Sequence, residues 1–494
     1  MFNKITPEKV GYHSQDIINL VKELNSFHLN THGILMLKGD DIFFETYYRP
    51  FNKDSLHRFY SETKSFISIA IGLLEEEGKL SISDPIVKFF PEYINENTHP
   101  YLLKQTIEDM LMMRTCVSHP TQWFYSPFND RVAYYFDKKY SPVVRPSGLF
   151  FEYDSDGSQV LCALVEKLSG LSILDYLKVK MFNDMGTFKN AYMLKTPTGV
   201  SWGDSGLIAT LRDQASFGRL VMNYGVYNGK RYINEQYVKT ATSKLISNDE
   251  TCFDSFSSKG YGYQIWHLDD DDFAFYGMGD QITLMFKKED VLVAIHSSNQ
   301  GNPLSRDIIY KKIREFVKNN GKCPLDDNPI EHQKLLKFAS LQSLRHQDKG
   351  QIVKLEKYIN GVTYIASEND LNIKEFSLTL DANSGTFCYI NKTGKKEINF
   401  GRGKNIFEKF PEEGYSNLVG KEITKGYFYN TANSGRWLDD EKFIIECQII
   451  DKYLGNLTIF ICFKEDYAYI KMVKNAENFL REYFGTLLAY KKGN

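Results

Sequence analysis

The sequence predicts an α+β domain followed by an all-β domain, and three observations lead to this prediction. The length of 494 residues exceeds what one ordinary hydrophobic core supports. Strand-like segments flank a mostly helical middle in residues 1–320, so a sheet is expected to form from both ends of that region. Residues 351–494 alternate in short segments between Gly, Asn and Asp turns, which is typical of a sandwich or barrel. A polar, partly helical connector is expected at 321–350.

The first elements of the α+β domain are predicted from turn and cap signals. Two apolar runs flank the turn at 38–41, which indicates a β-hairpin over 33–49. A long apolar run from Ser65 to Leu74 indicates a helix from about Ser61 to Glu77. Gly78 suits the position just after a helix, so we expect one helix over this run.

Later elements follow from periodicity and capping patterns. Thr106 with Asp109, and Thr210 with Asp213, have the spacing of a helix capping box. Helices are expected at 106–114, 158–169, 172–182, 210–224 and 306–318, and strands at 261–267, 273–278, 282–286 and 291–297. Residues 115–150 are rich in Pro, Tyr and Phe without periodicity, which indicates a long loop over a site.

Composition narrows the class of protein. Hydrophobic content of 42%, charged content of 25% and a net charge of −2 fit an ordinary globular protein and give no case for nucleic acid or an anionic membrane as partner. The N-terminus lacks the apolar core of a signal peptide, and no segment approaches the ~18 apolar residues of a membrane span. Seven scattered cysteines without C-x-x-C spacing suit reduced thiols, so we expect a cytoplasmic protein.

No metal site is predicted. The ten histidines form no H-E-x-x-H pattern. Four consecutive aspartates at 269–272 could suggest a cation site, but they separate two strand-like runs. A solvated hairpin turn is therefore the preferred interpretation.

The most informative motif is Ser61-Glu62-Thr63-Lys64, which occurs once as S-x-x-K. Residues three apart share one face of a helix, so the Ser61 hydroxyl and the Lys64 amine can exchange a proton. A partly buried amine is disfavoured in its charged form and can act as a base toward a neighbouring nucleophile. Free N–H groups at the helix start favour developing negative charge there. The alternative interpretation is a serine cap beside an exposed lysine.

Two further motifs can complete such a site. Tyr153 stands two residues before Ser155, and a phenol beside an ammonium can serve as general base or acid. The segment 276–281 carries two glycines between predicted strands, where backbone N–H groups could complete an oxyanion hole with that of Ser61. The alternatives are a packed aromatic residue and a plain glycine turn.

These motifs, in this order, resemble the serine β-lactamase-like hydrolases. That superfamily includes penicillin-binding proteins, class C β-lactamases, esterases and 6-aminohexanoate-dimer hydrolases. The matching segments are 59–66, 77–86, 106–111, 151–157, 205–213, 217–220, 260–263 and 277–281. The resemblance covers about residues 5–320 and implies a five-stranded antiparallel sheet with flanking helices and a helical subdomain.

The resemblance implies roles for individual residues. Ser61 would be the nucleophile, Lys64 its proton partner, and Tyr153 the base or acid that also serves deacylation. Backbone amides of Ser61 and about Gln281 would form the oxyanion hole. The chemistry implied is acyl transfer through an acyl-enzyme without a cofactor. The substrate-binding or oxyanion region would comprise Ser155, Tyr276, Met278, Gly279, Asp280 and Gln281.

The sequence also departs from the penicillin-recognising pattern. Ser155 stands where Asn is usual, and Met278 stands where Lys or His usually begins the third motif. A thioether cannot pair with a substrate carboxylate, and Asp280 adds negative charge. We therefore expect β-lactams and D-Ala-D-Ala peptides to be poor substrates, and neutral or cationic esters or amides to be preferred.

Two segments imitate known motifs. Gly203-Asp204-Ser205-Gly206 looks like the nucleophile loop of trypsin-like proteases, but a capped helix follows it and no suitable histidine motif precedes it. Lys392-Thr393-Gly394 has the letters of the third penicillin-recognition motif, yet it lies between strand-like runs of the all-β region. We interpret it as a hairpin turn.

The sequence thus favours a serine hydrolase acting on a small ester or amide. The alternatives are a catalytically weakened binding or sensor protein on the same fold, and a D-amino-acid peptidase or β-lactamase. A recognition role for the aromatics Tyr427, Tyr429 and Trp437 is a weaker interpretation than core packing. A small-molecule partner is expected, with no nucleic acid and no membrane. The substrate and oligomeric state stay open.

Overall fold

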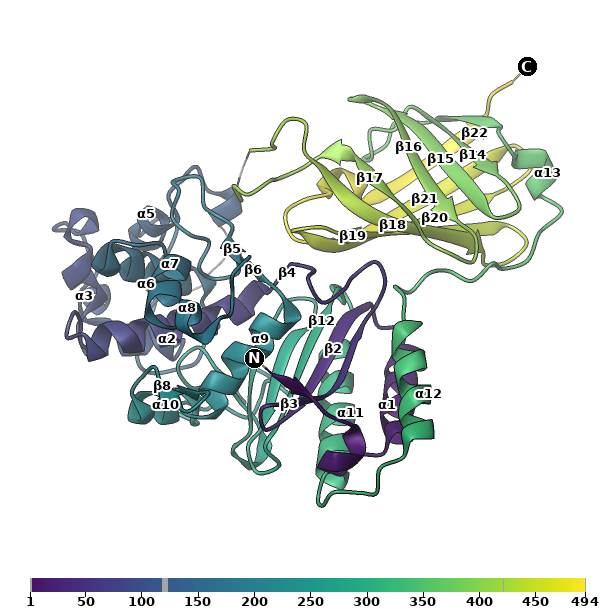
Figure 1. The fold of residues 1–494 in the computed structure, drawn as a ribbon. Helices are drawn as coiled ribbons and strands as arrows, with labels where there is room; N and C mark the ends of the chain where they lie inside the picture. Colours follow the sequence, from purple (N-terminus) through teal and green to yellow (C-terminus); the bar gives the residue numbers. More distant parts are fainter. Residues whose placement is uncertain (1, 118–122, 421, 494) are drawn as a thin grey trace. The chain divides into compact units, whose positions relative to one another are not determined.

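The computed structural model describes residues 2–117, 123–420 and 422–493 (Figure 1). Residues 118–122, which belong to the predicted loop at 115–150, lie outside this description. The chain divides into two compact units. The first comprises Met1–Ser297, Pro303–Ser343 and Asn417–Glu422, and the second comprises Ser298–Asn302, Leu344–Ser416 and Ile423–Asn494.

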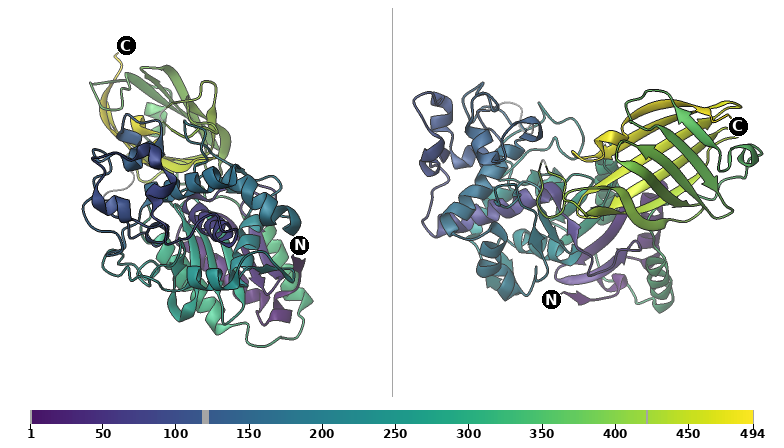
Figure 2. Two further views of the ribbon diagram at one scale, coloured as in Figure 1. Left: turned by 90° about the vertical axis from the view of Figure 1, so that its left-hand side faces the viewer. Right: turned by 90° about the horizontal axis from the view of Figure 1, so that it is seen from above.

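The first unit contains a seven-stranded sheet assembled from both ends of that region, as predicted (Figures 1 and 2). In spatial order its strands are β1 (Asn3–Lys4), β3 (Asp41–Tyr47), β2 (Thr31–Lys38), β12 (Val291–Ser297), β11 (Gln281–Phe286), β10 (Phe273–Gly277) and β9 (Trp266–His267). Strand β1 pairs parallel to β3, and the other pairs are antiparallel. The five longer strands correspond to the expected sheet.

Helices cover both faces of this sheet. Successive side chains of a strand point to opposite faces, so each central strand packs against helices on both sides. On β2, Leu35 and Leu37 pack with the helices α2 (Thr63–Glu76) and α9 (Leu211–Met222). Ile34 and Met36 pack with α1 (Ser14–Ser26), α11 (Ser305–Asn319) and α12 (Pro329–Ser340) on the opposite face. Burial on both faces explains why the central strands are continuously apolar.

A helical subdomain accompanies α2. Its helices are α3 (Pro100–Lys104), α4 (Ile107–Leu111), α5 (Arg131–Phe136), α6 (Ser155–Ser169), α7 (Ile173–Leu177) and α8 (Asn183–Met185), and α10 (Glu235–Thr242) lies later in the chain. Short strands complete the unit: β4 (His57–Arg58), β5 (Tyr192–Met193), β6 (Leu207–Ala209), β7 (Val226–Tyr227) and β8 (Lys230–Arg231). Both predicted capping boxes form, at Thr106 with Asp109 and at Thr210 with Asp213.

Two local predictions were wrong. The strand expected at 261–267 is confined to β9, because Gln264 has a left-handed φ of 57° that interrupts an extended path. The loop expected at 115–150 contains α5, whose start is capped by the Asp130 side chain. Helices α1 and α10 were not predicted.

The second unit is a closed barrel. Its strands are β13 (Thr363–Ala366), β14 (Glu375–Leu380), β15 (Ser384–Asn391), β16 (Gly394–Gly401), β17 (Ile406–Glu413), β18 (Phe428–Trp437), β19 (Lys442–Ile450), β20 (Leu454–Phe463), β21 (Tyr467–Ala476) and β22 (Gly485–Lys491), with the helix α13 (Glu356–Ile359) before them. Pairing of Gly401 with Ser434 joins β16 to β18 and closes nine of these strands into a ring.

Residues singled out in the barrel have structural roles. Tyr429 and Trp437 are buried, which favours core packing over recognition. Lys392 and Thr393 form the turn of the β15–β16 hairpin, where Asn391 pairs with Gly394, so the hairpin prediction for this segment is confirmed.

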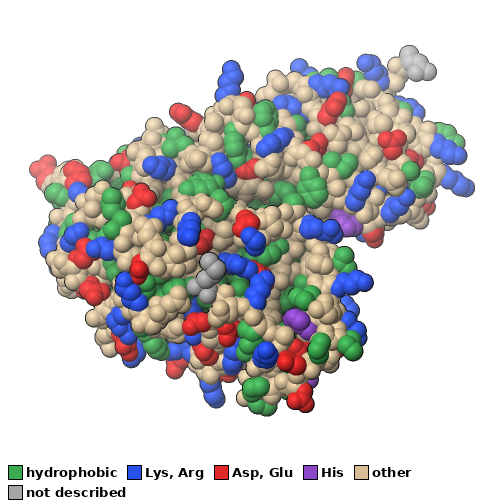
Figure 3. Space-filling view, viewed as in Figure 1, with side chains coloured by type: hydrophobic (Ala, Val, Ile, Leu, Met, Phe, Trp, Pro, Cys, Tyr) green, Lys and Arg blue, Asp and Glu red, His purple; other side chains and the backbone are tan. Residues whose placement is uncertain are grey.

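The surface and the helices agree with the composition. On the face shown in Figure 3, basic and acidic side chains are interspersed. None of the helices in the described ranges combines the length and apolarity that crossing a bilayer requires. The aspartates 269–272 lie in the turn between β9 and β10, as predicted, but Asp272 is buried and pairs with Lys318, so the turn is not solvated throughout. In the same ranges, no cluster of His, Cys, Asp and Glu side chains is arranged to hold a metal ion.

Three buried histidines meet beside the central strands: His32 on β2, His57 on β4 and His296 on β12. His32 Nδ1 lies 2.8 Å from His57 Nε2, and the rings of His57 and His296 stack with centroids 4.3 Å apart. Burial lowers the pKa of each imidazole, that of His57 from 6.5 to about 4. Each ring therefore stabilises the fold while neutral, above pH 6.5, and the contribution of His57 is lost as the pH falls toward about 4.

We predict that this cluster makes the first unit sensitive to acid. The melting temperature should fall between pH 7 and pH 4.5, and the fall should be smaller in His57→Gln by about 2–4 °C. Thermal unfolding followed by circular dichroism measures this difference. The control is His13→Gln at an exposed position, which should keep the wild-type loss. An identical acid loss in His57→Gln and wild type would contradict the prediction.

Candidate functional site

The S-x-x-K motif lies at the start of α2. A short 3₁₀ turn, η2 (Tyr60–Glu62), precedes the helix, and Lys64 is 1% exposed. Lys64 Nζ donates hydrogen bonds to Ser61 Oγ at 3.0 Å and to the backbone carbonyl of Asp204 at 2.8 Å. A hydroxyl and an amine that can exchange a proton are therefore in direct contact.

The residue before Ser61 has an unusual backbone conformation. Tyr60 is buried with a left-handed φ of 49°, which costs about 1–3 kcal/mol for a non-glycine residue. The Arg58 guanidinium lies over the Tyr60 ring, 4.1 Å from its centroid. Such strain is retained where surrounding contacts impose it, and it often accompanies functional sites.

Glu62 presents a buried carboxyl next to Ser61. It accepts hydrogen bonds from Gln214 Nε2 at 2.8 Å and from Thr283 Oγ1 at 3.0 Å, which link α2 to α9 and β11. Burial raises the pKa of Glu62 to about 8. Below that pH most of the carboxyl is neutral.

Tyr153 lies against Lys64. The Lys64 ammonium is 5.0 Å from the centroid of the Tyr153 ring, and that ring is parallel to Trp266 with centroids 5.9 Å apart. Asp154 follows, and its carboxylate caps α6 by accepting from the Gly157 N–H at 2.7 Å. Burial raises the pKa of Asp154 to about 6. The cap holds the Tyr153 segment at the start of a helix.

Ser155 does not take the part expected of a short polar side chain beside the lysine. Among the described residues, the hydrogen-bond acceptors of Lys64 are Ser61 and Asp204. Ser155 is the buried first residue of α6, and a serine side chain is shorter than the asparagine found in penicillin-recognising relatives. The second acceptor of Lys64 is therefore the backbone carbonyl of Asp204.

The hairpin β10–β11 closes against the same backbone. Gly277 pairs with Gln281, so Met278, Gly279 and Asp280 form the turn between them. A Cβ on Gly277 would lie 2.1 Å from the Phe59 carbonyl oxygen and 3.1 Å from the Ser61 nitrogen. Only glycine permits this approach, and it brings the end of β10 to the Ser61 N–H.

The turn itself has a backbone that favours glycine. Gly279 and Asp280 have φ values of 78° and 66°. The Gln281 side chain donates to the Ser297 carbonyl at 2.7 Å and to that of Met278 at 3.1 Å, which ties the turn to β12. The turn is therefore held in place from both of its ends.

Asp280 contributes a buried carboxyl to this hairpin. It is 2% exposed, and the Tyr276 hydroxyl donates to its Oδ1 at 3.4 Å. Burial and the neighbouring Asp280 raise the pKa of Tyr276, which keeps the phenol protonated. Arg306 lies over the Tyr276 ring at 4.7 Å and forms an ion pair with Asp254.

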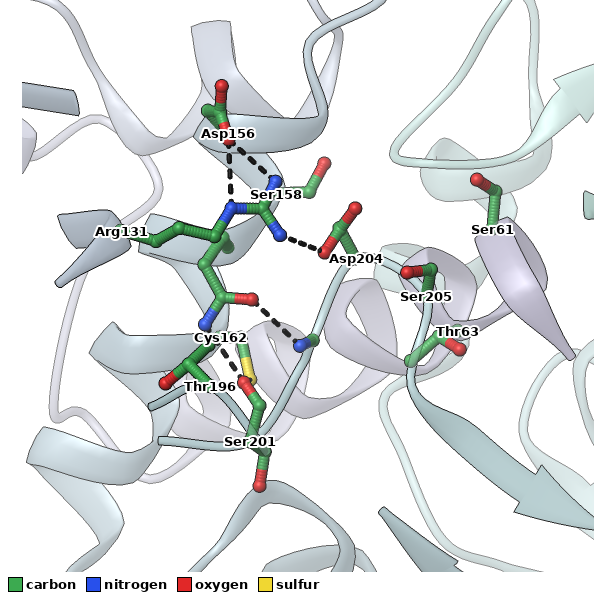
Figure 4. A network of polar contacts seen from close by, with 12 residues as sticks. Ser61, Thr63, Arg131, Asp156, Ser158, Cys162, Thr196, Ser201, Asp204 and Ser205 are labelled. Carbon is green, nitrogen blue, oxygen red and sulfur yellow. Dashed lines mark hydrogen bonds and ion pairs between the residues drawn. The ribbon is translucent and has the colours of Figure 1, made fainter. Parts of the chain in front are cut away.

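Sequence analysis missed the roles of Asp204 and Arg131, whose ion pair is drawn in Figure 4. Asp204 lies in the protease-like segment that was set aside, and its backbone carbonyl binds Lys64. A local sign that this segment packs closely is Gly203, where an added Cβ would lie 2.1 Å from the Cys162 Cβ. Arg131 stands in the region predicted as a loop, with no motif around it.

Comparison with known proteins places this site in a family. Residues 31–318, more than half of the chain, match the model of the β-lactamase family. The chain belongs to that family. The Ser61–Lys64 pair, Tyr153 and the β10–β11 hairpin all lie inside the region of this β-lactamase-family chain that matches.

Two curated relatives of this β-lactamase-family protein cover part of the chain. The 6-aminohexanoate-dimer hydrolase of Paenarthrobacter ureafaciens is 23% identical over 250 residues, which are 48% of this chain and 64% of that protein. Penicillin-binding protein 4* of Bacillus subtilis (strain 168) is 25% identical over 184 residues, 34% and 39% of the two chains. The aligned region thus spans less than two thirds of either relative.

Solved structures share the β-lactamase-like fold. A candidate 6-aminohexanoate-dimer hydrolase from Bacillus anthracis matches 65% of this chain and 87% of its own, at 19% identity and a TM-score of 0.53. An octameric penicillin-binding protein homologue from Pyrococcus abyssi matches 96% of this chain and 100% of its own, at 17% identity and a TM-score of 0.50. The fold is therefore shared across large sequence differences.

We predict that Glu62 makes stability fall with rising pH. The folded chain keeps a proton that the unfolded chain releases above pH 4.5, so its contribution is complete below that pH and is lost as the pH rises to about 8. Glu62→Gln cannot titrate, so its melting temperature relative to wild type should increase from about pH 5 to about pH 8.5. Thermal unfolding at both pH values measures this. Glu96→Gln, at an exposed site, is the control that should show no such trend, and a constant difference in Glu62→Gln would contradict the assignment.

Proposed function

We propose that this protein is a serine hydrolase that cleaves a small ester or amide through an acyl-enzyme on Ser61. The observation that carries the proposal is the 3.0 Å hydrogen bond between Lys64 Nζ and Ser61 Oγ at the start of a helix. Membership of the β-lactamase family supports it. The relatives named as a 6-aminohexanoate-dimer hydrolase and a penicillin-binding protein fit an amide or ester substrate.

In the proposed acylation, Lys64 in its amine form accepts the proton of Ser61 while Oγ attacks the carbonyl carbon of the substrate. The resulting oxyanion receives hydrogen bonds from the N–H groups of Ser61 and about Gln281. Collapse breaks the bond to the leaving group, which takes up a proton passed from Lys64 or Tyr153. The products are the Ser61 acyl ester and the free alcohol or amine.

Deacylation reverses these roles with water as the nucleophile. Tyr153, which lies against Lys64, assists removal of a proton from the water that attacks the acyl carbon. Breakage of the bond to Oγ then releases the carboxylic acid and returns the proton to Ser61. The cycle uses groups of the protein alone and requires no cofactor.

The hairpin residues favour substrates without a carboxylate. Met278 supplies no cation, and Asp280 keeps a carboxyl in the turn whose neighbour Gly277 touches the Ser61 backbone. A substrate carboxylate near this turn would lack a partner and meet like charge, which costs binding free energy. Neutral or cationic esters and amides are therefore the proposed substrates, ahead of β-lactams and D-amino-acid peptides.

A second candidate function is binding or sensing without turnover. The altered third motif, with Met278 in place of a cation, is the observation that favours it. The intact Ser61–Lys64 contact favours catalysis over this alternative.

We predict that a fluorophosphonate probe labels Ser61. Ser61→Ala should remove the label and lower ester turnover by about a thousandfold or more, because the nucleophile is lost. Intact-protein mass and peptide mapping locate the adduct. Ser68→Ala, which deletes a buried hydroxyl on the same helix, is the matched control and should keep the label. An unlabelled, folded wild type would instead favour the binding protein.

We also predict a preference among substrates that depends on charge. Wild type should turn over a neutral p-nitrophenyl ester much faster than nitrocefin, which carries a carboxylate. Asp280→Asn should raise kcat/KM for an ester with a carboxylate in its acyl part by about tenfold relative to its neutral analogue. Steady-state kinetics on the matched ester pair test this. Equal rates on nitrocefin and the neutral ester would refute the proposed preference.

A further inference from the structure

We propose that Arg131 is a positioning residue for the Ser61–Lys64 pair, acting through the Asp204 carbonyl. This inference rests on the proposed function, because it assigns the residue that holds the base of that reaction. Arg131 touches neither Ser61 nor Lys64 in the described hydrogen bonds and ion pairs. Its effect would therefore be transmitted through two buried carboxylates.

Arg131 joins two segments of the first unit (Figure 4). Its Nη1 donates to Asp204 Oδ1 at 2.7 Å, while Nε and Nη2 donate to Asp156 Oδ1 at 2.9 and 2.6 Å. All three side chains are buried, with 2%, 2% and 8% of the side chain exposed for Arg131, Asp156 and Asp204. A planar guanidinium can hold two carboxylates at a fixed separation, which a lysine cannot.

The first of these segments is the turn that ends at Asp204. The Asp204 side chain is bound to Arg131, and its backbone carbonyl accepts from Lys64 Nζ at 2.8 Å. Gln159 of α6 holds the same turn, because it donates to the Ser201 carbonyl at 2.8 Å and accepts from the Gly203 N–H at 2.9 Å. Rotation of this turn would move the acceptor that orients Lys64.

The second segment is the first turn of α6, which begins two residues after Tyr153. Asp156 lies in this turn, and Asp154 caps it. Arg131 therefore fixes the distance between the Tyr153 segment and the acceptor of Lys64. The indole rings of Trp202 and Trp123 lie 4.8 and 5.7 Å from the guanidinium and limit its movement.

The charges of this group explain why it stays together. One guanidinium faces two carboxylates, and each of them would be an uncompensated buried charge without Arg131. Coulombic attraction to both carboxylates raises the pKa of Arg131 despite its burial, so it is charged at all relevant pH values.

The test compares Asp204→Asn with Asp204→Leu in the full-length protein. Asparagine keeps an oxygen that accepts from Arg131, and leucine keeps the shape without an acceptor. We expect Asp204→Asn to label with a fluorophosphonate within about threefold of wild type, and Asp204→Leu to label about 10–100-fold more slowly, because small misplacements of a catalytic group cost this much. On a neutral p-nitrophenyl ester, kcat should fall by a similar factor while KM stays nearly constant.

Arg131→Lys provides a second variant in case Asp204→Leu does not fold. It should lower kcat about tenfold, because lysine reaches only one of the two carboxylates. The matched control is Arg219→Lys. Arg219 lies on α9, is also buried, and pairs with the two carboxylates of Asp40 and Asp290. That control should lose stability without a change in labelling rate.

Five results would decide against the inference. Wild-type labelling by a folded Asp204→Leu would overturn it, as would wild-type kcat in Arg131→Lys. A rise in KM at constant kcat would also overturn it, because it would indicate substrate binding. Absence of any Ser61 label in wild type would overturn the proposed function and this inference together, whereas slow labelling of Asp204→Asn and Asp204→Leu alike would overturn the inference alone.

Discussion

The site depends on the side-chain nitrogen of Lys64, which contacts two acceptors. Lys64 divides its hydrogen bonds between a side chain three residues away and a backbone carbonyl 140 residues away in the chain. The first contact follows from helical geometry, but the second requires that α2 be packed against the turn at Asp204. The burial of α2 between the sheet and α6, the cap on α6 and the Arg131 group all serve to place that carbonyl. The reactive pair is thus local in sequence but is held by the tertiary structure.

The same division decides how much could be predicted. Some features depend only on residues close together in the chain: the first hairpin, both capping boxes, and the spacing that lets Ser61 contact Lys64. Residue types and periodicity were enough to predict these features. The Asp204 carbonyl could not be anticipated, because every residue has a carbonyl and no side-chain pattern marks the one that is used. Helix α5 has six residues, too few for a periodic signal, and its Arg131 acts through partners 25 and 73 residues away.

Errors in the predicted strands have a similar physical origin. Gln264 adopts a left-handed conformation, and its backbone carbonyl and side chain bond to Ser65 and Ser158. These contacts stabilise a conformation that its own sequence does not favour. In the barrel, alternation indicated strands correctly but left sandwich and barrel equally open, since closure depends on the single pairing of β16 with β18. Tertiary contacts chose between states that local patterns could not separate.

The contact of Gly277 with the backbone at Phe59 and Ser61 has a consequence for the history of such a site. Both partners are main-chain atoms, so the geometry persists whatever side chains occupy the turn beyond Gly277. The side chain at 278 is therefore free to change under selection without loss of the anchoring strand, whereas the left-handed φ of 66° restricts the choice of residue at 280. The backbone contact that must be conserved is thus separate from the side chains that can vary. New substrate preferences can therefore arise while the Ser61 backbone keeps its position.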